Sequence, residues 1–495
     1  MDDQTVNKKS SINKPINQPS RIRGILRPVE IFFDVFFSHG ALHGITYLGK
    51  ALLHLVEKVL WIVLIVISLY FCVTLSLESW ERFLTKSTVV AIEKDHYYWN
   101  ISLPSLTICP MERIDRELFD QFAARSFMLD DEKIEMFEFI ESLANSTYMN
   151  FENIKGTANV DRILSMLRIA PKDYMILIAN LTQDLTRRDD HELRVRSQNN
   201  LEYIRSDQTL TEYGICYTTN SFIARNLTTS QLLKGHPPDE NEFYRNQKLH
   251  DVRYGNLFDG DVTYSFIGFN GAISVFYHSP YDTINIARYL PYSMEAYEFE
   301  AYSIESVTSE DFREHTTVSQ RGCRFFPESN LTHFNIYTKG ICLQECRLKI
   351  AFENCGCIPH FYPNNVKPPK PVCHYRTLKL CFPPLKELFL EFRGGPNHDS
   401  INCYCEQNCV DSKVIIERTQ VLIGTRKLLG SNGGLVLMKK YPLIRFSRQV
   451  LFTFTDLLVS IGGTAGLFLG FSVLGVVEIV YFFTLRLVWY CLGHR

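Results

Sequence analysis

Residues 457–477 read LLVSIGGTAGLFLGFSVLGVV, an uncharged run that ends at Glu478. As a helix, this run is roughly 31 Å long at about 1.5 Å per residue, enough to cross a bilayer core of roughly 30 Å. Gly462, Gly466 and Gly470 recur every fourth residue and therefore stay near one helical face. Such a face either lets membrane helices pack closely or, in an interrupted helix, exposes backbone carbonyls to a water-filled path for cations. The pattern alone leaves both interpretations open.

One other uncharged run, Val59–Leu77, is long enough to span a bilayer. The chain opens with the polar run Met1–Asn17, so we expect the first span to act as its own signal anchor. Lys and Arg outnumber acidic residues before this span, and the tail after Glu478 carries basic residues and no acid, which predicts that both termini are cytosolic. The predicted organisation is a cytosolic N-terminus (1–58), a first transmembrane helix (59–77), an extracellular domain (78–450), a second transmembrane helix (451–483) and a short cytosolic tail (484–495).

Cysteine placement agrees with an extracellular middle segment, because disulfides persist outside the cell and are rare in the cytosol. Of the 14 cysteines, only Cys72 and Cys491 lie in or beside the spans. The other cysteines, even in number, are Cys109, Cys216, Cys323, Cys342, Cys346, Cys355, Cys357, Cys373, Cys381, Cys403, Cys405 and Cys409. Close spacings such as Cys355-x-Cys357 therefore predict disulfides and not zinc sites. Candidate glycosylation sequons in the same segment are Asn100, Asn145, Asn180, Asn226 and Asn330.

The composition limits the classes of function. A chain of 495 residues that is 46% hydrophobic and 21% charged is too apolar for a disordered protein and too long for one ordinary compact domain. Its formal net charge of −2 argues against a nucleic-acid partner. The sequence contains no phosphate-binding loop, metalloprotease helix or nucleophile elbow, so we predict no enzyme activity, no cofactor and no metal site.

The predicted ectodomain alternates short strand-like runs, Ser102–Cys109 and Ala272–Tyr277, with charged helical stretches such as Met111–Leu143. Ten of its cysteines crowd into Cys323–Cys409. We expect this module to be stapled, because each native bridge contributes about 2–4 kcal/mol. The run Val410–Leu443 then returns the chain to the bilayer. A turn is expected there at Gly430, Gly433 and Gly434.

Five motifs, in order along the chain, resemble those of one known family. They are the His43-Gly44 segment, LPSLTIC at 103–109, GICYTTN at 214–220, the cysteine series that begins with RGC at 321–323, and GGTAGLFLGFS at 462–472 followed by Glu478. Together they resemble the degenerin/epithelial sodium channel family and, within it, the insect pickpocket-type subunits. The resemblance covers essentially residues 30 to 485.

The resemblance implies a two-pass membrane protein whose two transmembrane helices flank a large α+β disulfide-rich ectodomain of the palm, β-ball, knuckle, finger and thumb type. In this fold, residues 323–409 correspond to the thumb module. It also implies a subunit of a sodium-permeable, amiloride-sensitive channel of the plasma membrane, gated by an extracellular stimulus. The implied partners are the sodium ion, related subunits in a homo- or heterotrimer, and membrane lipid.

The resemblance also assigns roles to particular residues. The implied pore and selectivity residues are Gly466, Gly470, Phe471 and Ser472, and the implied gating residues are His43, Gly44 and Val459. The implied disulfides are Cys109–Cys216, Cys323–Cys409, Cys342–Cys405, Cys346–Cys403, Cys355–Cys381 and Cys357–Cys373. Two positions depart from the family pattern. The selectivity tract is usually Gly-Ser-Ser or Gly-Ala-Ser, whereas here its middle residue is Phe471, and Val459 stands where the family commonly has a small residue.

Two alternatives to a conducting subunit remain from the sequence. The first is a non-conducting accessory subunit of a heteromeric channel, which the bulk of Phe471 favours because a large side chain in a filter ring hinders hydrated ions. The second is a two-pass receptor or adhesion protein. A receptor would explain the cysteines, but it would not explain the glycine repeat or the His43-Gly44 motif.

Overall fold

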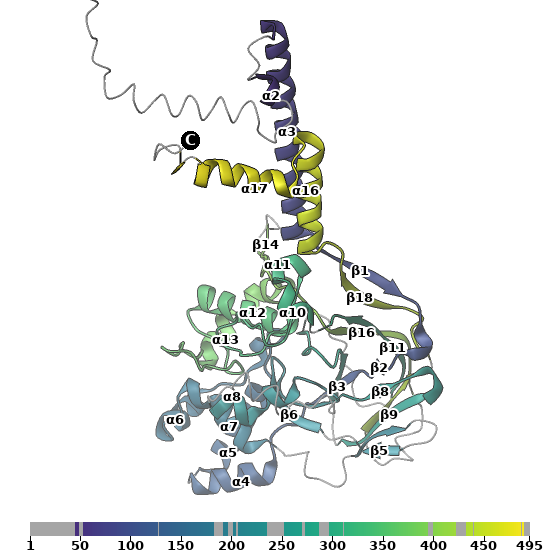
Figure 1. Cartoon of the computed structure of the whole chain (residues 1–495). Helices are drawn as coiled ribbons and strands as arrows, with labels where there is room; N and C mark the ends of the chain where they lie inside the picture. Colours follow the sequence, from purple (N-terminus) through teal and green to yellow (C-terminus); the bar gives the residue numbers. More distant parts are fainter. Residues whose placement is uncertain are drawn as a thin grey trace, which may run out of the picture. The chain divides into compact units, whose positions relative to one another are not determined.

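The computed structural model describes residues 45–48, 53–126, 128–182, 192–196, 201–203, 206–234, 252–269, 273–286, 297–309, 311–394, 399–421, 432–438, 440–486 and 488–489. The chain divides into two compact units (Figure 1). The first consists of Met1–Ser87 with Val450–Arg495, and the second of Thr88–Gln449.

The first unit is helical. Its elements are α2 (Ile45–Leu48), α3 (Leu55–Thr85), α16 (Phe454–Leu469), α17 (Val473–Tyr481) and a π-helical turn, η9 (Phe482–Arg486). Helix α3 is long and apolar enough to cross a membrane, and it extends the predicted span of residues 59–77 at both ends. Helix α16 and residues 473–486 pass the same criterion only together, as a pair bent by 75°.

The larger sheet of the second unit has eight strands in the order β1-β18-β11-β17-β9-β4-β5, with β16 paired to β11 (Figure 1). Their bounds are β1 Thr88–Glu93, β4 Glu192–Arg196, β5 Leu201–Tyr203, β9 Val262–Phe269, β11 Tyr297–Val307, β16 Asp411–Val421, β17 Asn432–Met438 and β18 Arg445–Val450. Strands β1 and β18, the first and last of the unit, are neighbours in this sheet. The chain therefore enters and leaves the unit along adjacent strands.

A second sheet has the order β10-β3-β7-β6, from β3 (Ser105–Pro110), β6 (Ser206–Thr211), β7 (Gly214–Thr219) and β10 (Ile273–His278). It contains both predicted strand-like runs. Strands β3 and β7 are buried along their whole length. Thr218 of β7 bonds through its hydroxyl to that of Thr107 on β3 at 2.9 Å and to that of Thr209 on β6 at 2.8 Å, which avoids the cost of unpaired buried polar groups. The described residues also form three short strand pairs: β2 (Ile101–Ser102) with β8 (Tyr254–Gly255), β12 (Cys323–Arg324) with β15 (Gln407–Asn408), and β13 (Arg393–Gly394) with β14 (Asp399–Ser400).

The helices of the second unit are α4 Arg116–Arg125, α5 Asp130–Ala144, α6 Ala158–Met166, α7 Tyr174–Leu181, α8 Thr229–Lys234, α10 Asp311–His315, α11 Val318–Arg321, α12 Lys339–Cys355, α13 Tyr375–Cys381 and α14 Lys386–Glu391. The predicted helical stretch Met111–Leu143 therefore contains two helices. Asp115 starts the first by accepting hydrogen bonds from the amides of Glu117 and Leu118, as an N-cap does.

The main apolar core joins helices α4–α7 to the cysteine-rich module. Its centre is aromatic: Tyr148 stacks on Phe389 with ring centroids 4.6 Å apart, and Phe151 meets Phe382 at 5.1 Å. The turn expected after Val410 is partly wrong. Gly433 and Gly434 lie inside strand β17, paired with β9, and Gly430 lies outside the described residues.

Candidate functional site

The glycine-rich segment begins as a regular helix with a capping box. The Thr453 hydroxyl accepts a hydrogen bond from the Asp456 amide at 3.2 Å, and the Asp456 carboxylate accepts one from the Thr453 amide at 2.8 Å. This reciprocal pair satisfies amides that a helix start leaves without partners. The Asp456 carboxylate is thereby committed to the start of α16.

Helix α16 packs antiparallel along α3 (Figure 1). Phe468 stacks with Phe71 at 6.0 Å between ring centroids, and Phe454 meets Phe83 edge-on at 6.2 Å. Between these contacts, the hydroxyls of Ser460 and Ser79 are 2.9 Å apart. Phe454, Ser460 and Phe468 fall on one side of the helix, so this side is the one that α3 covers.

The glycine repeat lies on the other side of α16. At 100° per residue, Gly462, Gly466 and Gly470 point roughly opposite to the side of Phe454 and Phe468. A Cβ placed on Gly462 would meet no described atom within 4 Å. Val459, on the same side as the glycines, is 69% exposed. The glycines therefore do not serve to pack α16 against α3, and at Gly462 their face meets no other described residue of this chain.

The helix is interrupted at the predicted selectivity tract. Gly470 ends α16 with φ +67° and ψ 23°, a left-handed backbone that glycine adopts without a Cβ clash. Its amide donates to the Gly466 carbonyl at 3.0 Å. Two residues later, the Ser472 hydroxyl accepts from the Gly475 amide at 3.0 Å and starts α17 as its N-cap. The sequence Gly470-Phe471-Ser472 thus places a helix stop directly before a helix start.

Phe471 connects the two helices and is half-buried. Its carbonyl oxygen turns back toward α16, where it would lie 3.4 Å from a Cβ on Gly466. A helix end leaves up to four carbonyls without an intrahelical partner. The amides of Gly470 and Phe471 pair with the carbonyls of Gly466 and Ala465, so the carbonyls of residues 467–469 are the ones left at the break. The break therefore gathers carbonyl oxygens, the Ser472 hydroxyl and small residues at one point. Oxygen ligands of this kind suit hard cations such as sodium.

Two implied gating residues, His43 and Gly44, lie outside the described residues. Helix α2 begins directly after them and is joined to α3 by stacking of Tyr47 on Trp61, with ring centroids 4.4 Å apart. The third, Val459, lies in the first half of α16, two turns before Gly466.

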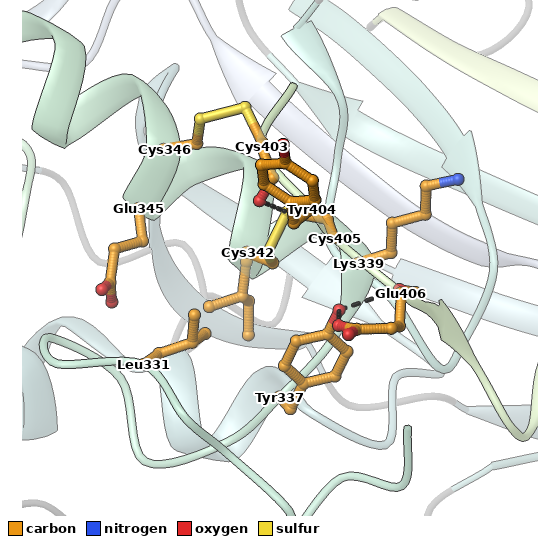
Figure 2. Close-up of a disulfide and its surroundings, with 12 residues drawn as sticks. Leu331, Tyr337, Lys339, Cys342, Glu345, Cys346, Cys403, Tyr404, Cys405 and Glu406 are labelled. Carbon is orange, nitrogen blue, oxygen red and sulfur yellow. Dashed lines mark hydrogen bonds between the residues drawn. A yellow bond between two sulfur atoms is a disulfide. The ribbon is translucent and has the colours of Figure 1, made fainter. Parts of the chain in front are cut away.

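Six disulfides staple the second unit, and they are the pairs that the resemblance implies. Figure 2 shows Cys342 and Cys346, one turn apart on α12, bridged to Cys405 and Cys403. In the same view, the Tyr337 hydroxyl donates to the backbone carbonyl of Glu406 at 2.8 Å. The first half of α12 is thus fixed to the segment that follows α14, and Cys355 at its end is bridged to Cys381 on α13.

A buried ion pair that we did not predict links α12 to the hairpin between β6 and β7. Arg347 donates to both carboxylate oxygens of Glu212, at 2.7 and 2.6 Å, and both side chains are 1% exposed. The Tyr362 hydroxyl donates to the same carboxylate at 2.5 Å. The nearby Glu212 carboxylate raises the pKa of Arg347 against the effect of its burial, so the guanidinium stays charged. These residues are far apart in sequence, and no local pattern connects them.

A second acid, the partly buried Asp282, places its carboxylate at the start of α12. Its carboxylate accepts from the Thr338 hydroxyl at 2.6 Å and from the Gly340 amide at 3.0 Å. Burial is the largest cause that raises the pKa of Asp282 to about 6, and the neighbouring carboxylate of Asp411 adds to it. A Cβ on Gly340 would lie 2.5 Å from this carboxylate, so glycine is needed there for the close approach.

The five sequons differ in accessibility. Asn100, Asn180 and Asn330 are exposed. The Asn145 side-chain nitrogen instead donates to the Met111 carbonyl at 2.7 Å, and that of Asn226 is buried without a partner. A glycan attaches through this nitrogen, so the fold disfavours glycosylation at Asn145 and Asn226 and leaves the exposed three as candidates.

Comparison with known proteins identifies the family. The family model described as amiloride-sensitive sodium channel matches residues 36–482. The chain belongs to the amiloride-sensitive sodium channel family. The predicted resemblance is confirmed, and the match runs from before the first span to the end of α17.

Individual relatives support this family assignment. Pickpocket protein 19 of Drosophila melanogaster is 24% identical over 90% of this chain and 89% of its own length. Sodium channel protein Nach of Drosophila melanogaster is 26% identical over 34% of this chain, and the human bile acid-sensitive ion channel is 24% identical over 34%. The aligned stretch spans about a third of the length of these last two relatives, 32% and 35%.

Membership of the amiloride-sensitive sodium channel family implies a two-pass chain of the plasma membrane with a disulfide-rich ectodomain. Members of the family are ion channels and not enzymes. The bent pair α16–α17 is therefore the segment to consider as the second membrane pass.

Proposed function

We propose that this chain is a pore-forming subunit of a sodium-permeable, amiloride-sensitive cation channel of the plasma membrane, gated by an extracellular stimulus. The ion constriction would be the break at Gly470, Phe471 and Ser472. One observation carries the proposal: the second apolar segment is interrupted at the three residues that the resemblance assigns to the filter.

Three physical features of the break favour a cation. The C-terminal end of α16 carries the negative end of the helix dipole, equivalent to roughly half an elementary charge. Unpaired carbonyls at that end can replace part of the hydration shell of an ion. Irregular backbone at membrane depth is tolerated only where it is buried in protein or lines a water-filled cavity. A water-lined pore gives the break at Gly470 a stable environment.

The free glycine face favours assembly of several copies. Because α3 covers one side of α16, the side with Gly462 and Gly466 remains to face neighbouring subunits and the pore axis. In this proposal, three subunits, identical or related, surround the pore, and both termini of each are cytosolic. The exposed apolar side chains of α3 contact lipid. His43 and Gly44 support the gate from below, and Val459 lies beside it.

The fold of the second unit fits a palm, β-ball, finger and thumb arrangement. In this assignment, the eight-stranded sheet is the palm, the sheet of β3, β6, β7 and β10 belongs to the β-ball, and helices α4–α7 form the finger. The stapled helices α12 and α13 form the thumb. A rigid module of this kind suits transmission of an outside stimulus to the membrane helices.

The test is current recorded from cells that express the chain alone and with pickpocket-type relatives, with external sodium then replaced by a large organic cation. The informative variant is Ser472→Ala, and its matched control is Ser460→Ala, which removes a hydroxyl on the α3 side of the same segment. We expect Ser472→Ala to shift the reversal potential between sodium and potassium and Ser460→Ala to leave it unchanged. Absence of current in every combination, despite surface delivery, would exclude a conducting role.

The bulk of Phe471 supports a second candidate, a non-conducting accessory subunit of a heteromeric channel. In that case, Phe471→Ala and Ser472→Ala would leave the selectivity of a co-assembled channel unchanged, while deletion of the chain would alter the surface amount or gating of its partner. A conducting subunit predicts the opposite, because Phe471→Ala would widen the ring and raise the current carried by larger cations.

A further inference from the structure

A cleft of about 530 Å³ lies between α6 with its following turn and residues 374–376. This volume is in the range of small-molecule sites, roughly 300–1,000 Å³. Leu164 and Tyr174, 4% and 1% exposed, contribute apolar surface to its lining. Arg168, His374 and Arg376 also line it. The cleft therefore combines a buried apolar surface with basic side chains.

Arg168 occupies a position that normally takes glycine. Its φ is +55°, and it follows α6 in the conformation that ends a helix. The Ile169 amide donates to the Leu164 carbonyl at 2.9 Å, and the Arg168 amide to the Ser165 carbonyl at 3.2 Å. These two bonds define a Schellman motif, in which a residue with a Cβ is strained. Strained residues of this kind concentrate at ligand sites, where function maintains them.

The charges around the cleft leave Arg168 uncompensated. The Asp161 carboxylate is paired with Arg376 and also accepts from the Tyr375 hydroxyl at 2.8 Å. Burial lowers the pKa of His374, which disfavours the charged imidazolium. Within the parts of the chain that the structure describes, the Arg168 guanidinium has no hydrogen bond or ion pair. The net charge of the lining is therefore positive.

The wall of the cleft formed by residues 374–376 is held in place. Cys357–Cys373 ends one residue before His374, and Cys355–Cys381 closes the far end of α13. The Tyr375 ring packs against α5 through Phe139, at 5.2 Å between centroids. It also fills the space where a Cβ on Gly156 would lie. A pre-formed site of this kind loses little entropy when a ligand binds.

We propose that this cleft binds a small organic monoanion, a carboxylate on an apolar body. The Arg168 guanidinium holds the carboxylate, and Leu164 and Tyr174 contact the apolar body. A single planar guanidinium matches the two oxygens of a carboxylate. A dianionic phosphate is disfavoured, because Asp161 is part of the same lining and only one cation is uncompensated. The site does not depend on ion conduction and goes beyond the proposed channel function.

The test uses photolabelling of the purified full-length chain with 4-benzoylbenzoate and with its uncharged twin, 4-benzoylbenzamide, followed by mass-spectrometric mapping. We expect the acid to label residues 164–174 or 374–376 and the amide to label them at least tenfold less. Arg168→Gly should reduce labelling by the acid by roughly tenfold or more. Because glycine fits the left-handed backbone, Arg168→Gly should also leave the melting temperature unchanged or raised.

Arg162→Gln is the matched control. Arg162 lies on the same helix but pairs with Glu132 outside the cleft lining, so labelling should persist. Equal labelling by acid and amide on the unaltered chain would overturn the proposal. So would full labelling of Arg168→Gly, or labelling confined to peptides away from the cleft. Because the readout is covalent labelling, a negative result here and a failure to conduct are separate outcomes.

Discussion

Helices α12 and α16 use the same local devices and have different surroundings. They are 17 and 16 residues long, each begins with a threonine N-cap, and each ends at a glycine in the left-handed conformation, Gly356 with φ +68° and Gly470 with φ +67°. Helix α12 is held by three disulfides, a buried ion pair and the carboxylate of Asp282. Helix α16 buries Leu457 and continues past its glycine into α17.

The residues that end a helix differ from the contacts that hold it in place. Caps determine where α12 and α16 start and stop, because they act within a few residues. Tertiary contacts decide whether a helix is rigid. Helix α12 is held by more cross-links than α16, and we therefore expect the α16–α17 break to change its bend more easily than α12 can move. Four predictions test this difference, from the largest expected effect to the smallest.

The largest effect is expected from Arg347→Ala. Removing one partner of a buried ion pair leaves Glu212 charged and uncompensated, which costs about 3–5 kcal/mol of unfolding free energy. Urea unfolding followed by tryptophan fluorescence measures the loss. Lys155→Ala removes an exposed partner of Glu138 and should cost less than about 1 kcal/mol. If both variants cost the same, the ion pair does not anchor α12.

Replacing Cys342 and Cys405 together by serine should lower the unfolding free energy by about 2–4 kcal/mol, because the unfolded chain regains the freedom of a long loop. A thermal melt with and without reductant measures the effect. Cys72 forms no disulfide, so Cys72→Ala is the control. The melting temperature of this variant should still fall when reductant is added. A melting temperature that is indifferent to reductant in the unaltered chain would contradict the role of the disulfides.

The raised pKa of Asp282 predicts that the stability of the fold decreases as the pH rises. Its folded pKa, about 6, lies above the ordinary value of 3.8, so the folded state binds the proton more tightly. Stability from this group is fully present below about pH 4, falls as the pH rises through 6, and then levels off, a change of roughly 2–3 kcal/mol. Asp282→Asn should remove this contribution between pH 4 and 7. Parallel stability profiles for both proteins would show that Asp282 does not titrate in this range.

The smallest expected change in stability comes from matched glycine variants, Gly356→Ala and Gly470→Ala. Each places a Cβ on a left-handed backbone at a cost of about 1–2 kcal/mol. At Gly356 the cost should appear as lower stability only, because a Cβ there meets no atom within 4 Å. At Gly470 the strain favours a straighter segment, so the ion current should change as well. Equal effects of both variants on current would remove the distinction between the two helices.

Much of the functional segment was predictable because its signals are local. The uncharged runs predicted two membrane segments, and the resemblance to a known family implied the cysteine pairing. The helix break also has a local signal: Gly470 is a residue type that ends helices, and Ser472, two residues later, is one that starts them. We interpreted these residues only as part of the filter. The turn expected at Gly433 and Gly434 was wrong, because their pairing partner β9 lies far away in the sequence.

The sequence by itself determined the two apolar segments, the caps at Thr453, Gly470 and Ser472, and the short motifs that place the chain in its family. These depend on side-chain type and on neighbours within a few residues. Only the tertiary structure decided which face of α16 is turned away from α3, that Arg347 pairs with Glu212, and that the side-chain nitrogens of Asn145 and Asn226 are engaged or buried. The physical reason is that burial and ion pairing depend on which distant segments meet, and in one sequence the spacing of residues does not encode those meetings.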